Sequence, residues 1–394
     1  MKKKILCAVL ALTLLLLSAA CGKPAADSSG ADPASGSAEG KPAPLSVTVP
    51  IRKVSKYGNL ILEATFDSMK KAGFAIGDIL TATVGEQTYD LPVGANYTDV
   101  DNGAMLCRFD SEDGEVGLAI NMGSFAEETG AAEKQETEED PGYRWEMKVT
   151  EVTLTLKEKG GYLDQYNARN LARTNDRADY AELTDAEFAN FRAVSVSGLK
   201  ENTLYRGSSP LDPDLGRNEY VMAAMENAGI KTVVNLADPE KEMKEYKAYP
   251  GSYYSSLDVL TPEMNYDFGS EAFAEAVKQS VSFLAEHDGP FFIHCKEGKD
   301  RTGVLSAVLE CFAGASWDEV KDDYMLTYRN FYGVTENDTA YDIVLNDNLV
   351  KTLCGLFGVD SLEGADLKEA ANKYLRSVGL SEEQLAALAE KLTA

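Results

Sequence analysis

The chain has 394 residues and is strongly acidic, with 64 Asp and Glu against 38 Lys and Arg and a formal net charge of −26. A field of this sign repels polyanions at long range, and no basic face or aromatic–basic interleaving is visible, which argues against a nucleic-acid partner. The length allows two domains after a leader.

The first twenty residues predict a signal peptide. Lys2–Lys4 supply positive charge, residues 5–17 are apolar, and small residues follow. The apolar stretch is too short to span a membrane. A cysteine directly after the small residues resembles a bacterial lipoprotein signal, which implies that residues 1–20 are removed and Cys21 is lipidated. We therefore expect an exported protein, lipid-anchored at the outer face of the bacterial cytoplasmic membrane, with a plain secreted form as the alternative.

Residues 21–44 predict a flexible stalk after the lipidated cysteine. They are almost wholly Ala, Gly, Ser, Pro, Asp, Glu and Lys, a composition that cannot bury a core. Without Cys7 and the acylated Cys21, four cysteines remain, which is too few for a disulfide scaffold.

Residues 45–161 predict a β-rich domain, either a barrel or a sandwich. Short runs rich in β-branched residues alternate with Gly, Asn and Asp turns. The segments Lys56–Leu60, Tyr97–Val100 and Ile120–Ser124 resemble the C-terminal β-domain of S-adenosylmethionine hydroxide adenosyltransferases. The companion domain of those enzymes is absent, so we expect a module that binds a ligand or positions the next domain, or else a structural spacer. The acidic run Glu127–Asp140 predicts a solvated surface loop, with a regulatory role as the alternative.

Residues 162–394 predict an α/β domain with a mainly parallel central sheet flanked by helices, because helical and strand patterns alternate. A capping box at Thr184–Glu187 opens one helix. Residues 366–378 and a run that opens at Ser381 predict two capped helices near the C-terminus.

The stretch His294-Cys295-Lys296-Glu297-Gly298-Lys299-Asp300-Arg301-Thr302-Gly303 carries the chemistry. It joins a short buried strand, Phe291–His294, to a buried helix that continues through residues 303–312. A strand that passes into a helix N-terminus presents free backbone N–H groups and the positive end of a helix dipole. A seven-residue loop with a thiol at one end and a guanidinium at the other can therefore wrap one phosphate.

Each residue type in this loop has a chemical reason to be there. The positive field should hold Cys295 as a thiolate, which makes it a nucleophile. Arg301 can grip two phosphoryl oxygens and keep gripping in the transition state. Gly298 lets the backbone turn, Thr302 can donate its hydroxyl to the sulfur, and His294 should shape the loop rather than act as a base. The catalytic pair Cys295 and Arg301 is thus surrounded by a substrate-binding set of His294, Lys296, Glu297, Gly298, Lys299 and Thr302.

The motif H-C-x-x-G-K-D-R-T-G resembles the signature of cysteine-dependent tyrosine and dual-specificity phosphatases, and its G-K-D-R variant is similar to a bacterial subgroup. The resemblance covers roughly residues 165–360 and includes Leu204–Ser209 and Asp323–Tyr328. It also includes Gly229–Leu236, which looks like the first core strand of the family. It implies a phosphomonoester hydrolase with a phosphocysteine intermediate and no metal or cofactor. Phosphotyrosine protein, phosphoinositide and inositol phosphate substrates all remain open.

The same resemblance implies a general acid, for which the sequence offers several carboxylates. Asp258 lies 37 positions before Cys295 and resembles the mobile acid loop of the family, so it is our first choice. Asp300, inside the loop, is a position that the subgroup is thought to use instead, and Asp267 is a third choice. An ordinary solvated carboxylate is the alternative for Asp258.

Two lysines add positive charge to the loop, and Lys299 in particular suggests a substrate with more than one phosphate. Solvated loop charges are the alternative reading for Lys296 and Lys299. At the level of the whole chain, the leading rival to an enzyme is a catalytically silent phosphate-binding surface lipoprotein. A sulfur transferase of the rhodanese type is disfavoured, because Arg301 and Thr302 close the loop in the phosphatase manner.

Overall fold

The computed structural model describes residues 44–110, 112–138 and 142–394. The predicted signal peptide, Cys21 and nearly all of the predicted stalk lie outside the described residues. Within the described ranges, no helix is both long enough and apolar enough to cross a membrane.

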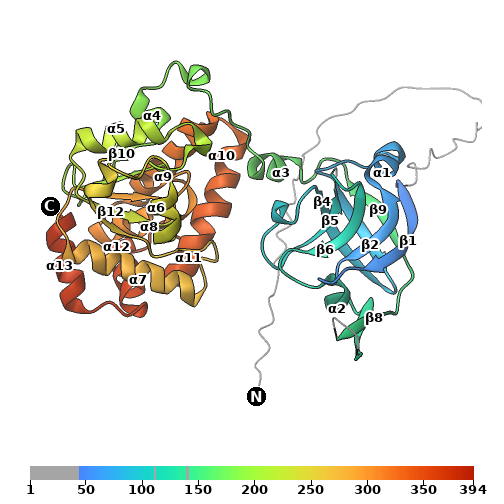
Figure 1. The fold of residues 1–394 in the computed structure, drawn as a ribbon. Helices are drawn as coiled ribbons and strands as arrows, with labels where there is room; N and C mark the ends of the chain where they lie inside the picture. Colours follow the sequence, from blue (N-terminus) through green and yellow to red (C-terminus); the bar gives the residue numbers. More distant parts are fainter. Residues whose placement is uncertain (1–43, 111, 139–141) are drawn as a thin grey trace, which may run out of the picture. The chain divides into compact units, whose positions relative to one another are not determined.

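The N-terminal part is a closed β-barrel, so the all-β prediction is confirmed (Figure 1). The order around the barrel is β1-β2-β6-β5-β4-β3-β9. Leu60, Leu80 and Leu118 are fully buried in its interior. The strands are β1 (Ser46–Val54), β2 (Leu60–Thr65), β3 (Ile79–Val84), β4 (Gln87–Gly94), β5 (Met105–Phe109), β6 (Glu115–Ile120) and β9 (Glu151–Glu158).

The acidic run is not the surface loop that the sequence predicted. It contains the end of α2 (Phe125–Thr129) and all of β7 (Ala132–Glu136), which pairs antiparallel with β8 (Tyr143–Met147). The acidic side chains stay solvated while the backbone forms the hairpin, and Lys134 packs over aromatic rings of β8. A run of acidic residues therefore does not by itself indicate a loop, because the side chains of a strand in a hairpin can face water. The barrel also carries α1 (Phe66–Ala72) and a 3-10 turn at Tyr97–Asp99.

The C-terminal part is built on a five-stranded sheet of order β10-β11-β14-β12-β13. Only the β10–β11 pair is antiparallel, so the prediction of a mainly parallel sheet is confirmed. The strands are β10 (Arg192–Ala193), β11 (Leu204–Gly207), β12 (Thr232–Asn235), β13 (Asp258–Leu260) and β14 (Phe291–His294).

Helices flank this sheet, and several begin at the predicted caps (Figure 1). Capping boxes are present at Thr184 with Glu187 and at Ser381 with Gln384. A π-helical turn, Leu345–Val350, joins α10 to α11. The helices are α3 (Leu163–Arg169), α4 (Asp185–Phe188), α5 (Asn218–Ala228), α6 (Glu240–Glu245), α7 (Glu271–Glu286), α8 (Asp300–Ala313), α9 (Trp317–Tyr332), α10 (Thr339–Val344), α11 (Lys351–Phe357), α12 (Leu367–Ser377) and α13 (Glu382–Leu392).

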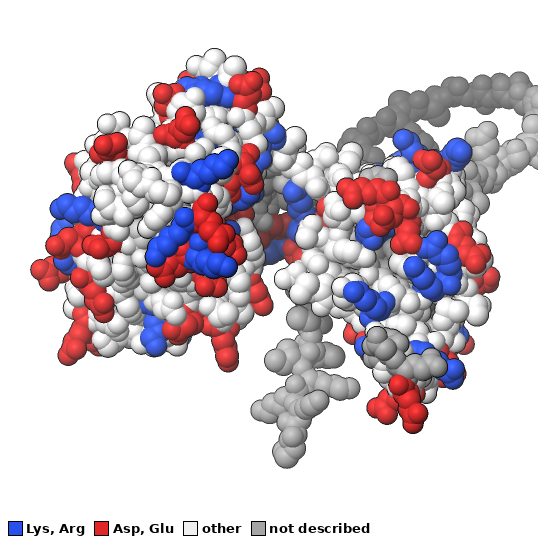
Figure 2. Space-filling model, viewed as in Figure 1, with Lys and Arg blue, Asp and Glu red and all other residues white. Residues whose placement is uncertain are grey.

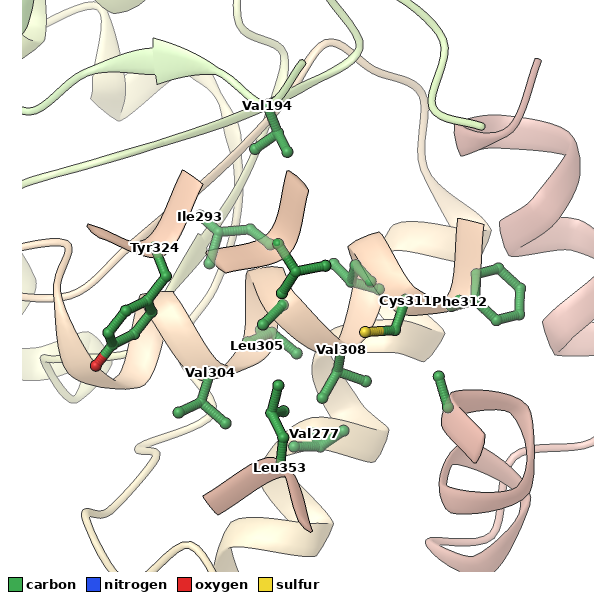
Figure 3. Packing of buried hydrophobic residues seen from close by; sticks show 14 of the residues in the cluster. Val194, Val277, Ile293, Val304, Leu305, Val308, Cys311, Phe312, Tyr324 and Leu353 are labelled. Atoms are coloured by element: carbon green, nitrogen blue, oxygen red, sulfur yellow. The ribbon is translucent and has the colours of Figure 1, made fainter. Parts of the chain in front are cut away.

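The central strand β14 and the helix α8 fix where the loop between them lies. Side chains of β14 alternate, with Phe291 and Ile293 packed in the core that surrounds α8 and Phe292 in the core on the opposite face. Figure 3 shows Val304 and Val308 of α8 within the first of these cores, together with the sulfur of Cys311. Because both elements are buried on all sides, the loop between them has little freedom to move.

Candidate active site

The backbone of the loop between β14 and α8 turns its carbonyl groups outward. The carbonyl oxygens of residues 296–298 each accept a hydrogen bond from outside the loop. The donors are the backbone N–H of Ser209 at 3.0 Å, the side-chain amide of Asn190 at 3.1 Å and the guanidinium of Arg206 at 3.0 Å. These bonds orient the peptide groups, so the opposite N–H groups point toward the centre of the loop.

The N–H groups of residues 296–302 have no hydrogen-bond partner in the part of the chain that the structure describes. The loop leads directly into α8, a helix of 14 residues. Backbone N–H groups that converge at a helix N-terminus form a binding site for an anion. The arrangement therefore supplies a cradle of the charge that a phosphoryl group requires.

Two glycines make this loop possible. Gly298 has a φ of +69°, and a Cβ there would lie 2.2 Å from the carbonyl oxygen of Gly207. At Gly303 a Cβ would lie 2.5 Å from the ring of Tyr324. The loop and the first turn of α8 therefore approach their neighbours more closely than any side chain would permit.

Cys295 and Arg301 stand at opposite ends of the cradle and are both nearly buried, with exposures of 3% and 8%. The Arg301 guanidinium donates to the carbonyl oxygens of Leu236 at 2.9 Å and Met264 at 3.3 Å. Among the described residues, the Arg301 Nε and the Thr302 hydroxyl have no partner. The expected bond from Thr302 to the sulfur of Cys295 is thus not formed. Two unpaired, buried donors beside the cradle mark positions where a ligand would be bound.

His294 shapes the backbone in front of the nucleophile. Its ring is fully buried, with Nε2 2.9 Å from the hydroxyl of Tyr254 and Nδ1 3.3 Å from the carbonyl oxygen of Cys295. Burial disfavours the imidazolium and lowers the pKa of His294 to about 3. The side chain is therefore neutral near pH 7, and its contacts are those of a positioning residue.

Both lysines of the loop are held by carboxylates. The Lys296 ammonium lies 3.1 Å from Asp212 and 2.7 Å from Asp214. The Lys299 ammonium lies 3.2 Å from Glu297 and 3.8 Å from Asp300. Lys299 is largely buried, whereas the Lys296 side chain stays 42% exposed, and both ammonium groups are paired with carboxylates.

The structure does not bring Asp258 to this site. Asp258 opens β13 and aligns with Thr232, which in turn aligns with Phe291, the first residue of β14. Cys295 follows the last residue of β14, so the two lie at opposite ends of the parallel sheet, about 13 Å apart along the strands at about 3.3 Å per residue. The choice of Asp258 as general acid is therefore corrected, since only residues beyond the carboxyl ends of the strands reach the loop.

Two other carboxylates meet this geometric requirement. Asp300 is the first residue of α8, and its side chain keeps 33% exposure. Its surroundings raise the pKa of Asp300, because desolvation outweighs the attraction of Lys299. Asp267 is exposed in the segment that follows β13, two residues beyond Asn265 and next to Tyr266. Asp300 and Asp267 therefore remain the candidates for the acid.

Tyr266 is a site residue that the sequence did not indicate. Its hydroxyl accepts a hydrogen bond from Arg301 at 2.8 Å, and its ring centroid lies 4.4 Å from the guanidinium carbon. The side chain is 60% exposed. An exposed aromatic ring beside the phosphate-binding arginine is thus available to a substrate. No motif in the sequence singles it out, since it lies in the irregular segment after β13.

A buried ion cluster behind the loop was also missed. Asp323 of α9 lies 2.5 Å from Arg206 and 2.7 Å from Arg192, and Arg206 in turn holds the carbonyl of Gly298. The sequence placed Arg206 and Asp323 in segments typical of the family without giving them a role. Their contacts cross more than a hundred residues, which no local pattern reveals.

No group of three or more residues able to hold a metal ion occurs within the described ranges. A comparison with known families covers the segment that contains this loop. Residues 186–394, more than half of the chain, match the model of the tyrosine phosphatase family. The chain belongs to the tyrosine phosphatase family. It is a cysteine-dependent phosphatase with the cysteine, arginine and strand-loop-helix context described above. Residues 51–138 match the C-terminal domain of SAM hydroxide adenosyltransferases, in agreement with the resemblance seen in the sequence.

Several solved structures are similar to part of this phosphatase at low sequence identity. P. aeruginosa TpbA in complex with pTyr is 20% identical over 46% of this chain and 94% of its own, with a TM-score of 0.28. The core catalytic domain of the S. cerevisiae PP-IP phosphatase SIW14 is 18% identical over 42% and 90%, with a TM-score of 0.26. An uncharacterized conserved protein from Thermotoga maritima is 22% identical, and the chain covers 35% of its length, with a TM-score of 0.22. No curated protein matches the chain.

Proposed function

We propose that this phosphatase hydrolyses phosphomonoesters through a phosphocysteine at Cys295. The observation that carries the proposal is the cradle. The N–H groups of residues 296–302 are unpaired among the described residues, while carbonyls 296–298 are held from outside. Preorganised donors of this kind stabilise charge that develops on a transferring phosphoryl group.

The reaction has two steps. In the first, the thiolate of Cys295 attacks phosphorus, the bond to the ester oxygen breaks, and an acid protonates the leaving alcohol. In the second, water attacks the phosphocysteine, the phosphorus–sulfur bond breaks, and inorganic phosphate leaves as the thiolate is restored. Arg301 and the loop N–H groups hold the equatorial oxygens in both steps, so their contribution is made in each transition state.

Asp300 is the acid that we propose. Its pKa is raised by desolvation, which keeps it protonated to a higher pH than an exposed carboxyl, as the first step requires. Glu297, on the same loop, has the opposite environment, because Lys299 and Arg173 outweigh its desolvation and lower its pKa. Two carboxyls whose pKa values are pushed in opposite directions suit different roles, one as acid and one as a fixed negative charge.

Phosphate release by the purified full chain tests this function. The substrates are p-nitrophenyl phosphate, a phosphotyrosine peptide, phosphoinositides and inositol hexakisphosphate, under reducing conditions, with Cys295→Ser alongside. We expect release that the substitution abolishes. A folded protein that binds phosphate but releases none from any substrate would instead support the silent phosphate-binding lipoprotein.

We also propose that the enzyme is exported and anchored by a lipid on Cys21, at the outer face of the bacterial cytoplasmic membrane. The support is the lipoprotein-like sequence around that cysteine. Metabolic labelling with a radioactive fatty acid should mark the wild-type chain and not Cys21→Ala. Equal labelling of both, or of neither, would contradict the anchor.

A further inference from the structure

Glu297 is the residue of the loop whose contacts are not explained by phosphate transfer. Its carboxylate accepts a hydrogen bond from Arg173, lies 3.2 Å from the ammonium of Lys299 and lies 3.5 Å from the hydroxyl of Tyr332. Arg173 precedes the sheet and Tyr332 ends α9, so three separate segments converge on one side chain. A carboxylate held by two cations and a hydroxyl occupies the kind of site that a phosphate would otherwise fill.

The charges around the cradle are closely balanced. Three cations beside Arg301 are each paired with at least one carboxylate, and four carboxylates take part in these pairs. Arg301 alone has no carboxylate within ion-pair distance in the described part of the chain. Figure 2 shows the same intermixing of acidic and basic side chains on the face of this domain that is in view. The paired cations are Arg173, Lys296 and Lys299, and the carboxylates are Asp212, Asp214, Glu297 and Asp300.

One guanidinium without a carboxylate partner, together with one set of loop N–H groups, suffices for one phosphate. A second phosphate on the same substrate would need Lys299 and Arg173, and it would meet the negative charge of Glu297 beside them. Glu297 is partly exposed and keeps its charge, because its pKa is lowered. Like charges at such short range repel strongly where the surroundings are only partly hydrated.

We propose that Glu297 is a specificity-determining residue that excludes a second phosphate, so that the substrate is an aromatic phosphate monoester that carries one phosphate. The exposed ring of Tyr266 beside Arg301 gives an aromatic substrate a surface to pack against. The inference rests on the proposed function, and it narrows the three substrate classes that the sequence left open. It also reverses the suggestion that Lys299 recognises a second phosphate.

The test compares binding of inorganic phosphate with binding of pyrophosphate, by titration calorimetry of the full chain. Cys295→Ser serves as the background in every case, so that no turnover occurs. Glu297→Gln removes the charge and keeps the shape, whereas Glu297→Asp keeps the charge. Asp318→Asn is the matched control, because Asp318 is an exposed carboxylate whose ion pair with Lys321 is on α9.

We expect Glu297→Gln to improve the affinity for pyrophosphate relative to phosphate roughly tenfold or more at low salt, since a like charge beside the second phosphate is removed. The gain should shrink at high salt. Glu297→Asp and Asp318→Asn should leave the ratio of the two affinities as it is. An unchanged ratio in Glu297→Gln, or an equal rise in Asp318→Asn, would overturn the proposal.

Turnover by the chain with Cys295 intact separates this inference from the proposed function. With wild-type protein, a phosphotyrosine peptide should be hydrolysed with a higher kcat/KM than inositol hexakisphosphate, and Glu297→Gln should narrow the difference. Hydrolysis of the peptide with no change in preference would refute only the role of Glu297. No hydrolysis at all would refute the proposed function, while the calorimetry would still decide whether Glu297 excludes a second phosphate.

Discussion

Replacement of Asp323 by asparagine should weaken the fold and the active site together. The Asp323 carboxylate is 8% exposed and pairs with Arg192 at 2.7 Å and Arg206 at 2.5 Å. Desolvation alone would raise its pKa, but the two guanidinium groups lower it overall. Asp323→Asn changes the volume very little and leaves two buried cations without their counter-charge.

The expected cost follows from that burial. Removing one partner of a buried ion pair costs about 3–5 kcal/mol, because the remaining charge is left uncompensated. The wild-type contribution is present above the ordinary Asp pKa of about 3.9 and is lost as pH falls toward the lower pKa of the folded state. The difference between wild type and Asp323→Asn should therefore be largest near pH 7 and shrink in acid.

Urea unfolding at pH 7 and below pH 3 measures this difference, with Asp322→Asn as the control. Asp322 is the preceding residue of α9 and is exposed, so its substitution should cost less than about 0.5 kcal/mol. In the folded fraction, kcat should also fall, because Arg206 would no longer be fixed where it holds the Gly298 carbonyl. Equal stability of the two variants at pH 7 would refute this reasoning.

Three further outcomes are expected. Asp300→Asn should lower kcat by about 10²–10⁴-fold and remove the decline in rate at high pH, whereas Asp258→Asn should leave kcat unchanged. A pH–rate profile in which Asp267→Asn shows the larger loss would identify Asp267 as the general acid instead. Gly298→Ala should lower the Tm and abolish activity, because the added Cβ meets a carbonyl oxygen at 2.2 Å and φ is +69°, and wild-type activity would contradict the geometry of the loop. The pKa of the buried His294 imidazole is lowered to about 3, so protonation of the unfolded chain opposes folding between about pH 6.5 and 3. His294→Gln should therefore reduce the loss of stability as the pH falls through this range. Identical slopes in the acid-unfolding curves of wild type and variant would refute this prediction.

The loop was predictable because all of its determinants are local. The strand Phe291–His294 has the predicted bounds, and the helix that follows starts three residues earlier than the predicted Gly303. Apolar runs on both sides, a glycine where φ is positive and five residues between cysteine and arginine are all visible in one short segment. The capping boxes at Thr184 and Ser381 were equally readable for the same reason.

Features that depend on strand register or on distant contacts were not predictable. Asp258 has a plausible spacing from Cys295, but β13 begins at that residue, so its side chain lies at the wrong end of the sheet. The pairing of Glu297 with Arg173 joins residues 124 positions apart, and the sequence shows only an acidic residue in a loop. The pairing of charges around the cradle therefore could not be predicted from the sequence and is visible only in the structure.

Trapping of the intermediate tests the central claim most directly. Rapid mixing of the full chain with p-nitrophenyl phosphate, followed by acid quenching and mass spectrometry, would detect a phosphoryl group on the peptide that contains Cys295. The account predicts a burst of nitrophenol equal to the enzyme concentration, together with that modified peptide, and neither in Cys295→Ser. Turnover at the wild-type rate by Cys295→Ser, with no phosphorylated cysteine in the wild type, would contradict it.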